Sequence, residues 1–244
     1  MTASLFLTAP VALFLFVAAI VPVDAQQPSP PTPAVDHPAP GDTSHAPVDK
    51  RIFGVLPNYR TANAAAPFVP LAAKRKFYIA TKDSLDYPSY ILAGAFAALY
   101  QLDDSHPSFG QGMAGYGRRY ATAVGDQIIG NYMTEAIMPS LTHEDPRYFR
   151  RGYGSKWSRI GYAATRIFVT RTDSGGTSFN CSEIFGNAIA AGVANAYYPD
   201  ERRLSDNFER LYTQLATDSF SQVLKEFWPD VKRHYLRKHR ADKE

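Results

Sequence analysis

Side chains suited to acid–base chemistry occur in a long helical stretch and in the turn that follows it. Asp126 and Glu135 interrupt an apolar helical pattern, and His143, Glu144 and Asp145 stand next to one another shortly after it. Carboxylates and an imidazole are groups that transfer protons or, as His143 with a carboxylate, hold a cation. Because metal-binding helices space their ligands three or four residues apart, three consecutive residues predict no metal site. These five residues are the candidates for a catalytic site.

The same residues also have a structural explanation. Buried charges need partners, and Asp126 could find one on another helix. Turn capping and salt bridges to neighbouring arginines would equally explain the cluster of His143, Glu144 and Asp145. The chain has no glycine-rich phosphate loop, H-E-x-x-H, G-x-S-x-G or dinucleotide fingerprint. The sequence therefore leaves open whether the protein is an enzyme, and it predicts no cofactor.

The first 25 residues predict a signal peptide. An apolar run from Leu5 to Val21 is followed by small residues up to Ala25, where we expect cleavage. No Lys or Arg precedes the run, so an uncleaved membrane anchor is the alternative. Cys181 is the only cysteine, which rules out an intramolecular disulfide and a lipid on a new N-terminus. We expect export to the periplasm or to the outer face of the cell envelope.

Residues 26–50 predict a disordered linker, because seven prolines alternate there with small polar residues and almost nothing apolar. The formal net charge of the whole chain is only +3, which together with export argues against nucleic-acid binding. The positive charge is concentrated in a C-terminal tail. Its basic residues could touch anionic lipid head groups or an envelope partner, or could be the solvated end of a helix: Lys232, Arg233, Arg237, Lys238 and Arg240.

Residues 51–244 predict one compact, all-α, multi-helix domain that ends in this basic tail. Apolar residues recur at helical spacing in Tyr87–Leu102, and we expect Ile91, Phe96 and Leu99 to face the core. We expect Pro139 and Pro229 to end two further helices. Helices are predicted at 71–80, 87–102, 113–138, 157–169, 181–198 and 205–228.

Small residues dominate the helix predicted after Asn180. Asn180 and Glu183 have the spacing of a capping box, and the alanines and glycines that follow predict close packing against a neighbouring helix. No run of alternating residues predicts a strand. The tightest helix contacts should therefore lie along this segment.

Four motifs together resemble an uncharacterised family of exported proteins from soil-type bacteria. They are FGVLPNYR (Phe53–Arg60), PSFGQG (Pro107–Gly112), EDPRYFRRG (Glu144–Gly152) and EFWPD (Glu226–Asp230). The resemblance implies export and a single domain. It implies no activity, ligand or catalytic residue.

Two functions of different kinds follow. The first is a cell-envelope protein without an enzymatic role, which associates with a membrane or a partner through small-residue helix faces and the basic tail. The alternative is a periplasmic hydrolase or ligand-binding domain in which Asp126, Glu135, His143, Glu144 and Asp145 converge on a pocket. Whether these side chains meet in one cleft separates the two.

Overall fold

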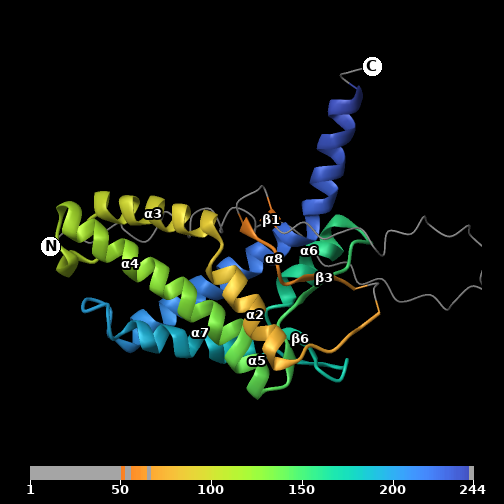
Figure 1. Ribbon diagram of the computed structural model, residues 1–244, viewed down its shortest axis with the longest axis horizontal. Coiled ribbons are helices and arrows are strands. Elements are labelled where there is room, and N and C mark those ends of the chain that lie inside the picture. The colour runs from red at the N-terminus through yellow and green to blue at the C-terminus, as the bar shows by residue number, and fades with distance from the viewer. Residues whose placement is uncertain (1–50, 53–55, 65–66, 242–244) are drawn as a thin grey trace, which may run out of the picture. The chain divides into compact units, whose positions relative to one another are not determined.

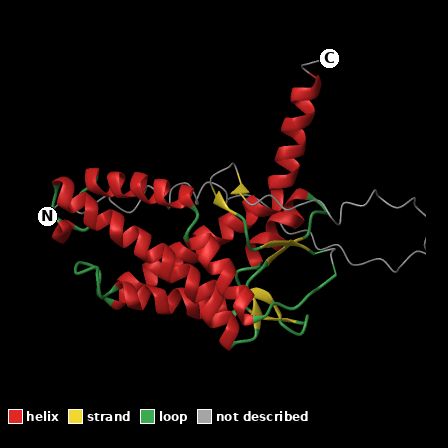
Figure 2. Cartoon of the chain, in the orientation of Figure 1, coloured by secondary structure: helices red, strands yellow, loops and turns green. Residues whose placement is uncertain are grey.

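The computed structural model describes residues 51–52, 56–64 and 67–241. The predicted signal peptide (1–25) and proline-rich linker (26–50) lie outside the described residues. The described part of the chain is mostly helical, as the sequence predicts (Figure 2). By their contacts, the described residues fall within one compact unit.

The helical elements account for most of the described chain. They are α2 (Ala73–Ser84), α3 (Tyr87–Leu102), the 3-10 turn η1 (Pro107–Phe109), α4 (Gly112–Asn131), the π-helical turn η2 (Tyr132–Ile137), α5 (Met138–Leu141), α6 (Lys156–Thr165), α7 (Cys181–Ala194) and α8 (Leu204–Ala241). Elements α4, η2 and α5 follow one another without a break and form one long rod.

The long helices form a row. Helix α4 contacts α3 on one side and α7 on the other, and α7 in turn contacts α8 (Figure 1). Helix α2 packs on η2, and α6 packs on α8. Helix α7 approaches η2 closely at Gly186, where an added Cβ would lie 3.0 Å from the side chain of Thr134. A larger residue here would have to push η2 away by a few tenths of an ångström.

Neither proline ends its helix as predicted. Pro139 lies in the first turn of α5, where the missing N–H and the fixed φ are tolerated, and the π-helical turn precedes it. Helix α8 passes through Pro229 and continues to Ala241. A proline marks a helix boundary only by tendency, and both helices here continue past it.

The loops between the helices contain short paired strands, whereas the sequence predicts no strand. β1 (Arg51–Ile52) pairs antiparallel with β2 (Leu56–Pro57), and β3 (Thr61–Asn63) pairs parallel with β5 (Tyr148–Arg150). β4 (Glu144–Asp145), β6 (Val169–Thr172) and β7 (Thr177–Phe179) form an antiparallel sheet. Strands of two to four residues are too short to show an alternating pattern, so only their pairing defines them. Two of these pairs, β3 with β5 and β4 with β6, join segments far apart in sequence.

The interior is unusually polar and the surface unusually apolar. Helix α3 was expected to bury its large apolar side chains, but Ile91 is 67% exposed and Phe96 is 51% exposed. Its buried residues are instead Pro88, Ser89, Ala93 and Ala97. Because small side chains let α3 lie close to α4, the large ones point outward. The prediction that α3 is a core helix is therefore wrong.

Candidate functional site

Asp126 lies on α4 and is held by two tyrosines and an arginine. The hydroxyls of Tyr197 and Tyr198 donate to its two carboxylate oxygens at 2.6 and 2.8 Å, and Arg210 Nη1 lies 3.4 Å away. Arg210 also pairs with Glu201 at 2.5 Å. Asp126 therefore joins α4 to the segment between α7 and α8, and its oxygens are used for that contact.

The three consecutive candidates diverge. His143 is exposed and takes a left-handed backbone conformation with φ of 55°. Glu144 is buried and accepts the backbone N–H groups of Cys181 and Ser182 at 3.1 and 2.7 Å, so it caps the N-terminus of α7. Asp145 is buried and holds the guanidinium of Arg147 at 2.6 Å. Two of the three thus stabilise the fold locally.

Glu135 belongs to a second group of buried charges that comes from five separate elements. It lies in the π-helical turn η2, close to Asp83 of α2, and Arg60 Nε approaches its carboxylate at 3.5 Å. The described residues whose charges act on one another in this buried charge cluster are Arg60, Asp83, Glu135, Glu183, Asp218 and Lys225. Apart from Glu135, none of them was among the candidate site residues from the sequence.

Two protons hold the buried charge cluster together. Burial and then the charge of Asp83 raise the pKa of Glu135 well above its ordinary value. Burial and then the charge of Asp218 raise the pKa of Glu183 to about 8. Two carboxyl groups bond to each other only when one keeps its proton, so Glu135 donates to Asp83 and Glu183 to Asp218. Two remaining carboxylates then balance Arg60 and Lys225.

The Glu183 proton predicts a pH dependence of stability. Because the folded pKa of about 8 is above the ordinary 4.5, the folded chain keeps a proton that the unfolded chain releases. The contribution of the Glu183 proton to stability should be full below about pH 4.5 and should fall toward pH 8 by up to about 1.4 kcal/mol per pH unit, and the raised pKa of Glu135 adds a contribution of the same sign. The lowered pKa of Lys225, about 8, acts in the opposite direction only above that pH.

Replacing Glu183 with glutamine should flatten this slope between pH 5 and 8, because the amide keeps the shape and a donor but does not titrate. Urea unfolding at several pH values measures it. The exposed Glu209 of the same bundle gives the control, since Glu209→Gln should leave the slope unchanged. Equal slopes in wild type and Glu183→Gln would contradict a protonated Glu183.

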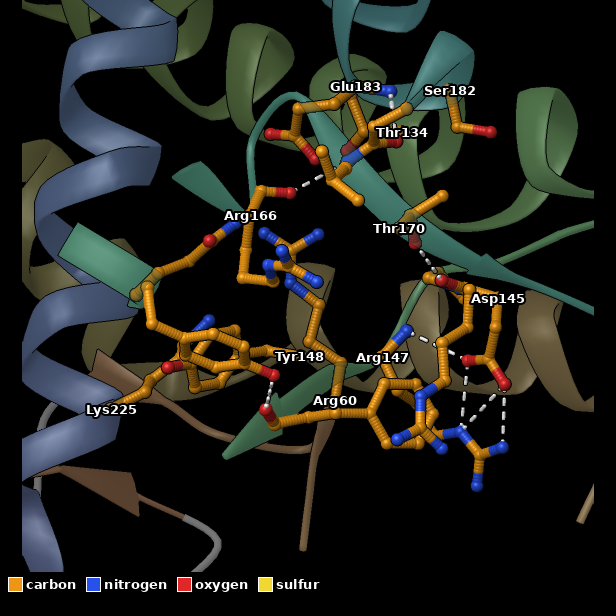
Figure 3. Close-up of a pocket in the computed structure, with 17 residues that line it drawn as sticks. Arg60, Thr134, Asp145, Arg147, Tyr148, Arg166, Thr170, Ser182, Glu183 and Lys225 are labelled. Atoms are coloured by element: carbon orange, nitrogen blue, oxygen red, sulfur yellow. Dashed lines mark hydrogen bonds and ion pairs between the residues drawn. The ribbon is translucent and has the colours of Figure 1, made fainter. Parts of the chain in front are cut away.

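A small pocket opens beside the buried charge cluster. The centres of water molecules can occupy about 40 Å³ of this pocket, which is room for about three waters. Figure 3 shows Arg60, Arg166, Glu183 and Lys225 around it, from four different parts of the chain. The lining residues carry five cationic side chains (Arg60, Arg147, Arg166, Arg171 and Lys225) against two carboxyl groups (Asp145 and Glu183).

The sequence did contain a signal for part of this site. Asp218, Gln222 and Lys225 have the spacing i, i+4, i+7 and therefore share one face of α8. That face points inward, since Gln222 and Lys225 are buried. The sequence could therefore have predicted a polar stripe on this long helix. It could not have predicted that the stripe meets Arg60 and Glu135, because that depends on the fold.

Apolar side chains form stripes on the outside of the row. On α7, Phe185, Ile189 and Val193 are exposed at a spacing of four residues. On α8, Leu204, Phe208 and Tyr212 repeat the same spacing and are also exposed. Helix α3 contains no charged residue at all, and exposes Tyr87, Ile91, Phe96, Leu99, Tyr100 and Leu102. Such contiguous apolar surface is typical of a docking face.

Among the described helices, none is both long enough and apolar enough to cross a membrane. Within the same residues, no group of three His, Cys, Asp or Glu side chains is placed to hold a metal ion. Comparison of the chain with protein-family models, with curated proteins and with solved structures finds no match.

Proposed function

We propose that this chain is an exported protein of the cell envelope that docks on a lipid surface through helix α3. The single observation that carries the proposal is an uncharged helix of 16 residues whose large apolar side chains point away from the rest of the fold. Soluble monomers rarely expose an apolar surface of this kind, and such a surface usually marks an interaction site. Partner binding through the same face is the competing explanation.

The length of α3 and the residues at its ends favour a lipid surface over a protein as the binding partner of this helix. At 1.5 Å per residue the helix is about 24 Å long, shorter than a hydrocarbon core of about 30 Å. It therefore suits a position in the plane of the interface, with its apolar side in the acyl chains. Tyr87 and Tyr90 lie near one end of α3 and Tyr100 near the other, and tyrosine prefers the depth of the lipid head groups.

The basic tail adds charge complementarity to this proposal. Helix α8 continues into that tail, and the side chains of Lys232 and Arg233 are exposed. Each Lys or Arg near an anionic membrane surface contributes about 1 kcal/mol of attraction. Apolar contact and positive charge together predict binding that a salt wash weakens and that detergent releases.

The test is fractionation of cells that produce the full-length chain. A salt wash should remove only part of the wild-type chain from membranes, and detergent should release the rest. A variant with Ile91→Glu, Phe96→Glu and Leu99→Glu should move to the soluble fraction, because the free energy of inserting three charges among acyl chains is strongly unfavourable. These side chains are exposed, so the fold should tolerate the changes, and circular dichroism of the purified variant checks it.

Leu141→Glu is the matched control, since Leu141 is 69% exposed but lies at the end of α5. It should fractionate like wild type. A soluble wild-type chain would overturn the proposal. So would a triple variant that stays with the membrane, because the chain would then be held by another segment, such as the apolar run at residues 5–21. A wild type that pellets without lipid, as an assembly, would favour a protein partner.

A further inference from the structure

We infer that the pocket beside the buried charge cluster binds a phosphate group, held by Arg60, Arg166 and Lys225 and by the amide of Gln222. This inference concerns a different face of the chain from α3 and is independent of membrane docking. It rests on the pairing of the cations that line the pocket, on an orphaned acceptor and on the size of the space.

The cations that line the pocket differ in how well the protein pairs them. Arg147 is fully engaged, because it donates to both oxygens of Asp145 and to the carbonyl of Val69. Arg171 lies over the ring of Phe149 at 4.2 Å, and none of its nitrogen atoms is both buried and without a hydrogen-bond partner among the described residues. By contrast, Arg166, Arg60 and Lys225 keep donors available toward the pocket.

Arg166 lies over the ring of Tyr162, and its buried Nε has no hydrogen-bond partner in the described chain. Arg60 has one loose contact there, from Nε to Glu135 at 3.5 Å. No described carboxylate lies within salt-bridge distance of Lys225, although its side chain is buried. A buried cation without a close partner is unfavourable, so an anion from solution would complete the site.

The charges of Asp83 and Asp218 act on Arg60 and Lys225 from a distance, but among the described residues neither carboxylate forms a close ion pair with them, so their donors stay open to an oxyanion. The proton on Glu183 leaves its carboxyl neutral at neutral pH, and Asp218 accepts from Asn187 and Gln214. The N-terminus of α7 also lies at the pocket, but Glu144 already caps its first amides. The available attraction for an anion therefore comes from the three cations.

Gln222 selects among anions. It is only 6% exposed, it lines the pocket, and its Oε1 has no partner among the described residues. A ligand that satisfies this acceptor needs an O–H or N–H beside its negative oxygens. Phosphate in its mono- or dihydrogen form has both, whereas sulfate and chloride have no proton to donate at neutral pH. The space for about three waters also suits one such group.

The experiment titrates the purified full-length chain with inorganic phosphate by calorimetry, in chloride buffer of constant ionic strength. One saturable site is expected. Arg166→Gln should weaken binding at least about tenfold, as expected for the loss of a charge-assisted hydrogen bond. Arg151→Gln is the matched control, because Arg151 also lies over the ring of Tyr162 but does not line the pocket.

Gln222→Leu keeps the test decisive if Arg166→Gln does not fold. It removes an amide whose buried oxygen has no partner among the described residues, so the fold should tolerate it, while phosphate binding should weaken and sulfate should bind about as well as phosphate. A second titration uses glycerol 3-phosphate in place of inorganic phosphate. Tighter binding than inorganic phosphate would identify a phosphomonoester as the ligand, and equal binding would identify the free ion.

Two results would overturn the inference. One is the absence of saturable binding by the folded wild-type chain up to about 10 mM phosphate, beyond the range of a specific site. The other is equal weakening in Arg151→Gln and Arg166→Gln, or unchanged affinity in both Arg166→Gln and Gln222→Leu, because the ion would then bind elsewhere or through net charge alone.

Discussion

Replacing Glu226 with alanine is expected to lower the free energy of unfolding by about 3–5 kcal/mol, because four donors would lose their shared acceptor in the interior. The side chain of Glu226 is completely buried on α8. Its carboxylate accepts four hydrogen bonds, from the hydroxyl of Tyr148 at 2.8 Å, the backbone of Arg151 at 3.0 Å and Gly152 at 2.8 Å, and Arg159 Nε at 2.8 Å.

These partners come from β5, the loop after it and α6, so one carboxylate joins three segments to α8. Alanine would leave the hydroxyl of Tyr148 and the Nε of Arg159 without their acceptor, while Arg159 would keep its ion pair with Asp230. Glu226→Gln should cost less, because the amide oxygen still accepts two of the four bonds. Chemical denaturation measures both variants.

Glu209→Ala is the matched control on the same helix, at an exposed position where a change within about 0.5 kcal/mol is expected. A loss of less than about 1 kcal/mol in Glu226→Ala would contradict the role of this carboxylate as a fold-holding acceptor. The residue opens the EFWPD motif, and the structure gives that motif a physical role, since Asp230 also pairs with Arg159 at 2.7 Å.

Arg119→Met is expected to release the loop between α3 and α4, with a loss of about 3 kcal/mol. The Arg119 side chain is fully buried, and its guanidinium donates to the carbonyls of Ser105 at 2.8 Å, Gly110 at 2.6 Å and His106 at 3.2 Å, and to the side chain of Gln101 at 2.6 Å. One cation thus satisfies four acceptors.

The loop needs this support because its backbone is strained. Asp104 and His106 have positive φ, which non-glycine residues adopt at a cost of about 1–2 kcal/mol each. Methionine matches the stem of arginine but donates nothing, so the loop should open locally while the helices persist. Amide hydrogen exchange at Phe109 and Gly110, whose N–H groups bond within the loop, measures the opening.

Arg118→Met is the control, since the neighbouring Arg118 is exposed and makes one bond to the carbonyl of Phe109 at 3.1 Å. Exchange in the loop should change much less in this variant. Protection that is identical in wild type and Arg119→Met would show that the loop is held by other contacts.

Features that depend on one short segment of the chain, such as helix bounds and caps, could be predicted from the sequence. The helix Tyr87–Leu102 has the predicted bounds, and Asn180 accepts the N–H of Glu183 at 3.1 Å, as its capping position predicts. The second half of the predicted capping box is wrong, because the N–H of Asn180 donates to the carbonyl of Phe168 and not to Glu183. Capping and helix propensity depend on neighbours within a few residues, so the sequence alone determines them.

Orientation of the helices was decided by tertiary structure. The spacing of apolar residues on α3 says which side chains share a face, but it cannot say whether that face meets protein or another environment. Only the position of α3 at the end of the row, against α4 and with Ser89, Ala93 and Ala97 buried, turns Ile91 and Phe96 outward.

The candidate site shows the same division. Sequence supplies the inventory of charged groups, including Glu135 of the buried charge cluster. Their meeting depends on distances between residues as far apart in the chain as Arg60, Glu135 and Lys225, which no local pattern encodes. Because a charge is governed by whatever lies within a few ångströms of it, whichever element that comes from, partners and protons are properties of the folded chain.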